Sequence, residues 1–226
     1  MPLAAVVREW NTDSPGPTLA YNGSASSATA LYFPSQHRDS WGWTSWVHVQ
    51  NPTDFGVSVR MKYYPTTGGT QPLYSTDSIY ISPHGSTYFW TGSTPLNNYF
   101  GPAELERTSE SGSVVAICNE VNGSKALSYD AFPTMGTAQI SLPAQGNVNG
   151  WDTWTFIQNP HAFPVNVTIT YRDRYGGSES SYSWINIPAH GSVYRAASSH
   201  IPGAQGSAWV SADQPVVAIV NQVGSG

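Results

Sequence analysis

Two segments of this 226-residue chain, residues 43–64 and residues 151–172, align with each other without a gap. Nine of the 22 aligned positions are identical, including two tryptophans, a Gln-Asn-Pro triplet and a tyrosine. A second match pairs IYISPHGSTY with INIPAHGSVY, and a third pairs residues 113–122 with residues 215–224. Self-similarity of this kind is typical of tandem structural units. We therefore expect two homologous units of roughly 100 residues, a size at which a domain can bury its own core.

Within each unit the apolar residues alternate with polar ones, as in residues 57–63 and 165–171. A period of two indicates half-buried β-strands, and the Asn-Pro, Gly-Gly and His-Gly pieces between such runs indicate turns. Only 10% of the residues are charged and 13% are aromatic, which also suits a turn-rich β-protein. The expected fold is all-β, with two tandem immunoglobulin-like sandwiches.

The two units differ in the sequence after their third matching segment. SVVAICNEVN, at residues 113–122, is succeeded by ALSYDAF, which we interpret as the last strand of the first unit. PVVAIVNQVG has no such strand after it here, whereas LAYNG, at residues 19–23, matches ALSYDAF at the offset that relates the Trp motifs. We expect residues 1–24 to be a donor strand segment and spacer, 25–133 to be the first domain, and 134–226 to be a second domain that lacks its last strand.

A sandwich without an edge strand exposes backbone N–H and C=O groups beside its core, and a donated strand would cover them. Each regained ladder bond contributes about 0.5–1.5 kcal/mol, and each buried Leu or Val about 1.5–3 kcal/mol. Donation between molecules is head-to-tail and generates a filament. Residues 19–23 align better with the missing strand, but we slightly favour residues 2–10 for their β-branched content. The donor candidates are Leu3, Val6, Val7, Trp10, Leu19 and Tyr21, and the acceptor groove candidates are Val216, Val217, Ile219, Val220 and Val223.

This layout resembles the subunits of bacterial donor-strand fibres, such as chaperone–usher pili. It is closer to fibrils from environmental samples, whose subunit is an N-terminal strand plus two Ig-like domains. The repeat, with its WxxW, QNP and PVVAIVNQV pieces, is similar to Ig-like repeats of bacterial surface proteins, and the similarity covers nearly the whole chain. One departure is that pilus donor segments precede a single domain, whereas here the segment precedes two. The resemblance implies an extracellular structural subunit whose partners are copies of itself.

Other classes of function find less support in the sequence. The formal net charge is -5 without a basic run, so nucleic acid is a poor partner, and no apolar run approaches the roughly 20 residues of a membrane span. No histidine lies at a metal-ligand spacing and no nucleophile motif occurs, so we expect no enzyme activity, metal or cofactor. His84 and His190 recur in His-Gly-Ser pieces of both units, which predicts a structural turn.

Tryptophans, glycans and the single cysteine leave further alternatives. We expect Trp43, Trp46, Trp151 and Trp154, which the repeat relates, to pack in the core or at a domain junction. Trp41, Trp90, Trp184 and Trp209 lack a Trp counterpart and could stack on sugars, as in a carbohydrate-binding module. A fragment of a tandem-repeat cell-surface adhesin is the other alternative.

Cys118 excludes an internal disulfide and is expected to be a small buried residue. Candidate glycosylation sites, which would suit an extracellular location, are Asn22, Asn122 and Asn166.

Overall fold

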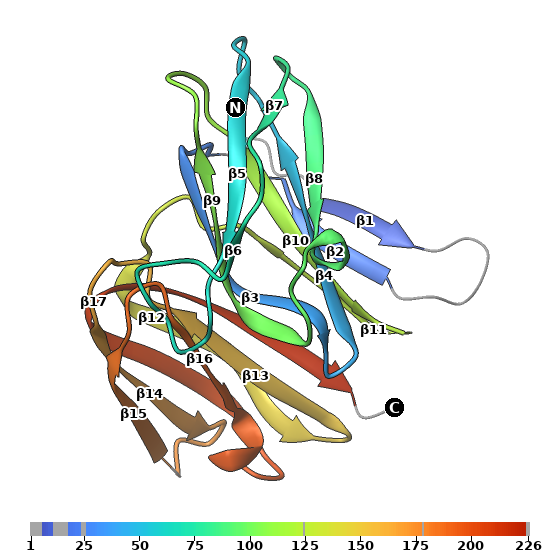
Figure 1. The fold of residues 1–226 in the computed structure, drawn as a ribbon. Coiled ribbons are helices and arrows are strands. Elements are labelled where there is room, and N and C mark those ends of the chain that lie inside the picture. Colours follow the sequence, from blue (N-terminus) through green and yellow to red (C-terminus); the bar gives the residue numbers. More distant parts are fainter. Residues whose placement is uncertain (1–5, 11–17, 24–25, 124, 178, 225–226) are drawn as a thin grey trace, which may run out of the picture. The chain divides into compact units, whose positions relative to one another are not determined.

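The computed structural model describes residues 6–10, 18–23, 26–123, 125–177 and 179–224, with only the backbone of residues 6–10, 18, 19 and 22. The described chain is all-β, as the sequence predicts, apart from two short 3-10 helices (Figure 1). It divides into two compact units. The first comprises Met1–Pro65 and Gln71–Thr134, and the second comprises Thr66–Thr70 and Met135–Gly226.

The strands of the first unit form two layers around a core, apart from the first two strands, which form a separate two-stranded sheet. Their bounds are β1 (Val6–Trp10), β2 (Thr18–Asn22), β3 (Ala30–Ser40), β4 (Trp43–Gln50), β5 (Val57–Tyr63), β6 (Tyr74–Ser75), β7 (Ile79–Ile81), β8 (Ser86–Trp90), β9 (Tyr99–Arg107), β10 (Val115–Asn122) and β11 (Lys125–Asp130), with the 3-10 helix η1 (Thr91–Ser93) after β8. The ladder order is β11-β10-β4-β3-β9-β5-β6, with β7 on β5 and β8 on β4. β3 pairs with β9 along residues 30–39 and with β4 near its end, so it passes from one layer to the other.

Strand β5 shows why these residues form such layers. Val57, Val59, Met61 and Tyr63 are fully buried, while the residues between them are partly exposed. Successive side chains of a strand point to opposite faces, so alternating apolar residues place one continuous row in the core. This confirms the alternation predicted for residues 57–63.

The second unit repeats this arrangement with fewer strands. Its elements are β12 (Thr137–Val148), β13 (Trp151–Gln158), β14 (Val165–Asp173), β15 (Glu179–Ile187), β16 (Ser192–Ala196) and β17 (Gln205–Gly224), with the 3-10 helix η2 (Ala197–Ser199) after β16. The ladder order is β15-β14-β17-β12-β13-β16. β17 is 20 residues long: residues 206–212 pair with β14, and residues 217–224 pair with β13. A single strand therefore belongs to both layers.

The repeated Gln-Asn-Pro triplet fixes the same loop in both units. In each, the fully buried asparagine donates its side-chain N–H groups to three backbone carbonyls. The acceptors lie 2.7–3.2 Å from Asn51, at Phe55, Ile81 and Ser82, and 2.8–3.0 Å from Asn159, at Phe163, Ile187 and Pro188. A side chain that satisfies three carbonyls of an irregular loop explains why both copies keep it.

The two repeated histidines occupy turns. His84 and His190 have φ values of 55° and 56°, in the left-handed region. Their backbone N–H groups donate to the carbonyls of Thr53 (3.3 Å) and His161 (3.0 Å). The structure thus places both in the predicted turn, with the backbone bend that their φ values describe, and the His84 imidazole also lies 2.9 Å from Asp54 Oδ1.

Candidate strand-binding site in the second unit

The second half of β17 corresponds to β10 of the first unit. β10 pairs with β4 in a register that sets Val115 opposite Gln50, and β17 pairs with β13 in a register that sets Val217 opposite Gln158. These residues are counterparts in the sequence repeat, so the two ladders are equivalent residue by residue. We therefore compare β10 and β17 at the edges that face away from β4 and β13.

The other edge is covered in the first unit only. There, residues 117–122 of β10 pair with β11. Within the described chain, no strand pairs with the corresponding edge of residues 219–224 of β17. Since the backbone groups of an antiparallel strand alternate between its two edges, part of this segment's hydrogen-bonding capacity faces that side.

At the positions of β10 that β11 covers, the side chains are more deeply buried than their counterparts in β17. Cys118 and Glu120 are fully buried and lie opposite Tyr129 and Leu127 of β11. Their counterparts in β17 are Val220, which is partly buried, and Gln222, which is exposed. The absence of a covering strand in the described second unit accounts for this difference.

In the first unit a tyrosine of β11 completes a buried polar cluster. The Tyr129 hydroxyl donates to the Ser35 carbonyl, and Gln36 Nε2 donates to Cys118 Sγ (2.8 Å) and to the Tyr129 oxygen (3.3 Å). Burial raises the pKa of Tyr129 well above its usual value, and nearby Cys118 and Glu120 raise it further. Burial likewise raises the pKa of the Cys118 thiol, so both groups are neutral hydrogen-bonding partners. Cys118 is buried as expected.

The second unit retains the glutamine without its tyrosine. FPSQ, ending at Gln36, corresponds to LPAQ, ending at Gln145. Gln145 is 3% exposed, and its Oε1 accepts from Thr153 Oγ1 at 3.0 Å. Its Nε2 has no hydrogen-bond partner in the described structure. A buried polar group without a partner costs about 1–3 kcal/mol, so this amide marks an incomplete site.

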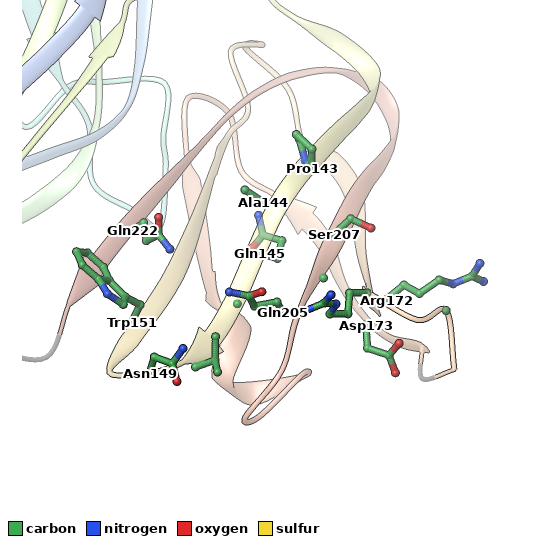
Figure 2. Close-up of a pocket in the computed structure, with 15 residues that line it drawn as sticks. Pro143, Ala144, Gln145, Asn149, Trp151, Arg172, Asp173, Gln205, Ser207 and Gln222 are labelled. Atoms are coloured by element: carbon green, nitrogen blue, oxygen red, sulfur yellow. The ribbon is translucent and has the colours of Figure 1, made fainter.

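A concave site of about 780 Å³ lies over this glutamine (Figure 2). Its walls come from β12, from the start of β13, from the end of β14 and the turn after it, and from both ends of β17. Among the lining residues are Ala144, Gln145, Trp151, Arg172, Gln205 and Gln222. The volume lies in the range of ordinary ligand sites, and polar groups converge in it.

The predicted acceptor residues fall on two faces of β17. Val216 belongs to the core of the second unit and Val220 packs against it. Val217, Ile219 and Val223 alternate with them, so their side chains point to the opposite face of the strand. Sequence reasoning missed Gln145, although the repeat of FPSQ as LPAQ is a signal that could have found it.

The predicted donor residues lie in a hairpin or outside the described residues. Leu3 is among the residues that are not described, and of Val6, Val7, Trp10 and Leu19 only the backbone is described. β1 and β2 pair with each other, with Val7 opposite Tyr21. β2 lies beside β11 in the first unit. The described pairings do not join either strand to β17.

The tryptophans and the candidate glycosylation sites occupy varied environments. None of the four repeat-related tryptophans belongs to either buried core, and Trp151 is 50% exposed. Trp41 and Trp90 are exposed, whereas Trp184 packs against the second core and Trp209 is partly buried. Asn122 Nδ2 donates to the Trp41 carbonyl (3.0 Å), and Asn166 Nδ2 donates to Asp213 Oδ2 (2.7 Å). The side chain of Asn22 is not described.

Among the described residues, no group of three or more His, Cys, Asp or Glu side chains could hold a metal ion. In the same residues, no helix has the length and apolar character needed to cross a membrane. No protein-family model matches the chain, and no curated protein sequence is significantly similar to it.

Proposed function

We propose that this protein is a non-enzymatic structural subunit of an extracellular fibril, built from two immunoglobulin-like sandwiches. Each molecule donates a strand from its first 24 residues to the second unit of a neighbour, and copies of the chain join head to tail. Backbone pairing and apolar burial supply the forces, so no cofactor takes part. The layout of the chain, a leading strand segment followed by two units, is similar to that of donor-strand fibre subunits and supports the same interpretation.

The observation that carries this proposal is the edge of β17. β10 pairs with β4 in the same register in which β17 pairs with β13. In the described chain, however, only β10 has a strand on its second side. An uncovered edge is a template for pairing with another chain. Because donor and acceptor are different surfaces of the same molecule, each junction leaves a free donor and a free acceptor, and growth continues.

Electron microscopy and light scattering of the purified chain test this function. We expect filaments or a ladder of oligomers from the full chain and monomers from a variant lacking residues 2–23. Circular dichroism and thermal unfolding of the variant control for folding. Filaments that persist in the deletion variant, or a full chain that stays monomeric under all conditions, would contradict the proposal.

A tandem-repeat adhesin is the second candidate, because a following repeat could supply the same strand within one longer polypeptide. In that case the deletion of residues 2–23 leaves the oligomeric state unchanged. Exposed Trp41 and Trp90 favour a carbohydrate contact in such a protein. Quenching of tryptophan fluorescence by glycans, lost in Trp41→Ala or Trp90→Ala, would support this candidate.

A further inference from the structure

We propose that the occupant of the open edge of β17 is strand β2 of a second copy, with Tyr21 seated beside Gln145. This inference rests on the proposed strand insertion. It adds which segment inserts, in which register, and which side chain fixes that register. It also reverses the preference for residues 2–10 that β-propensity alone suggests.

The first unit supplies the geometry of a filled site. On β11, Tyr129 lies opposite Cys118 of β10, and Leu127 lies opposite Glu120. From that position the Tyr129 hydroxyl reaches β3, where it donates to the Ser35 carbonyl and accepts from Gln36 Nε2. A single tyrosine therefore ties the last strand, which pairs with β10, to β3 as well.

The second unit presents the same receiving groups. Ala144 and Gln145 stand where the first unit has Ser35 and Gln36, and both line the cavity (Figure 2). Gln145 Nε2 is buried and has no partner among the described residues. A tyrosine hydroxyl both donates and accepts, so it can satisfy this amide and also donate to the Ala144 carbonyl. The groups that fix Tyr129 are present, and the tyrosine is what they lack.

The sequence of β2 matches this requirement. Leu19 and Tyr21 have the spacing of Leu127 and Tyr129, whereas residues 2–10 contain no tyrosine. Tyr21 precedes Gln36 by 15 residues, and Tyr129 precedes Gln145 by 16. Both strands therefore lead into the following unit through connectors of nearly equal length. Transferring the β10–β11 register sets Tyr21 opposite Val220 and Leu19 opposite Gln222.

The β1–β2 hairpin of one molecule can pair as a unit with the open edge of β17 in another. β1 pairs with one edge of β2, and no strand of the described chain is hydrogen-bonded to the other edge of β2, although β2 lies beside β11 and would leave that position on insertion. Pairing of that second edge with β17 gives the order β13-β17-β2-β1. β1 then acts as an outer cover for β2, so residues from both candidate segments take part while only β2 touches the acceptor.

Disulfide trapping between two singly substituted chains tests the register. In a Cys118→Val background, Thr18→Cys and Val223→Cys are expected to lie opposite each other, within the reach of a disulfide. Mixing the two chains should give cross-linked dimers, and every such bond joins two molecules because each chain carries one cysteine. The matched control, Asn22→Cys mixed with Val223→Cys, places the thiols about 13 Å apart along the strand and should not cross-link.

A double-mutant cycle in the full chain tests the side-chain contact. We expect Tyr21→Phe to raise the critical concentration for filament formation about tenfold, because Gln145 is left buried without its partner. In a Gln145→Leu background the same change should have an effect below about twofold. A tyrosine that contributes only apolar surface would show no such coupling. Tyr175→Phe, at a side chain that is 83% exposed, is the control.

The outcomes separate this inference from the proposed function. Cross-linking of the Asn22→Cys pair instead of the Thr18→Cys pair, or zero coupling between Tyr21 and Gln145, overturns the inference. Filaments that require residues 2–23 but tolerate Tyr21→Ala overturn the inference and leave strand donation standing. A full chain that never polymerises overturns both.

Discussion

The two units of this protein have the same sequence repeat and equivalent β10–β4 and β17–β13 ladders in the same register. They differ at the second edge of β10 and β17. In the first unit β11 covers β10, and Gln36, Cys118 and Glu120 are buried under it. In the second, the described structure leaves Gln222 exposed and gives Gln145 Nε2 no partner. The cores therefore form without the last strand, whereas the polar groups at that edge depend on it.

The largest expected contrast is between the two homologous tyrosines. Tyr129→Ala should lower the free energy of unfolding of the first unit by about 4 kcal/mol, since it removes a partly buried aromatic side chain that packs against the core, together with its hydrogen bonds. Tyr21→Ala should change the stability of either unit in the monomer by less than about 1 kcal/mol. Urea denaturation below the concentration of assembly measures both. Equal losses would show that Tyr21 already supports a fold within its own chain.

Where the units are alike, matching substitutions should have matching effects. Asn51→Ala and Asn159→Ala each leave three backbone carbonyls without their donor and should each cost about 3 kcal/mol. Asn97→Ala, at an exposed loop position, serves as the control. Unequal losses, measured as two resolved unfolding transitions, would break the equivalence of the two loops.

Acid should weaken the first unit in particular: burial lowers the pKa of a histidine in both units, but His37 of the first unit is more deeply buried than His200 of the second. Burial lowers the pKa of His37 to about 4, a direction that Glu120, 3.9 Å away, does not reverse. The unfolded chain, with a His pKa of about 6.5, binds the proton more tightly, so stability falls as the pH drops from about 6.5 towards 4. We expect His37 to cost the first unit about 2 to 3 kcal/mol over this range.

The pH contribution of His37 is isolated by comparison with a variant. The second unit carries Gly146 at the corresponding place, since its N–H donates to Thr153 Oγ1 as the His37 N–H donates to Ser45 Oγ. The difference in unfolding free energy between the unmodified chain and His37→Gln should therefore grow below pH 6.5 only in the first transition. A difference that is constant with pH would refute the assignment.

The smallest expected contrast concerns the two glutamines. Gln36→Leu removes a donor to Cys118 and Tyr129 and should destabilise the first unit by about 1 to 2 kcal/mol. Gln145→Leu removes a buried N–H group without a partner, and it also removes the acceptor of the Thr153 hydroxyl. Because the gain and the loss offset each other, the stability of the monomeric second unit should change by less than about 1 kcal/mol. Thermal unfolding monitored by calorimetry measures both changes. A loss in Gln145→Leu equal to that in Gln36→Leu would remove the distinction between the sites.

The repeat and its alternation were sufficient to predict the all-β class, because rows such as Val57 to Tyr63 have only one way to bury their apolar face. The burial of Gln145 could not be predicted in the same way. Glutamine is mostly a surface residue, and only the pairing of β12 with both β17 and β13 places Gln145 inside. Core packing was the wrong expectation for Trp151, because the repeat retains this tryptophan at a position that is half exposed.

β17 runs without interruption from one layer of the second unit to the other. Where the pull on a fibre runs along β17, a strand seated on its second half is loaded parallel to its own axis. All the rungs of that ladder then share the load at once, and the covalent backbone passes the tension directly into the opposite layer. Such a joint is expected to withstand stretching far better than peeling, which opens the rungs one after another.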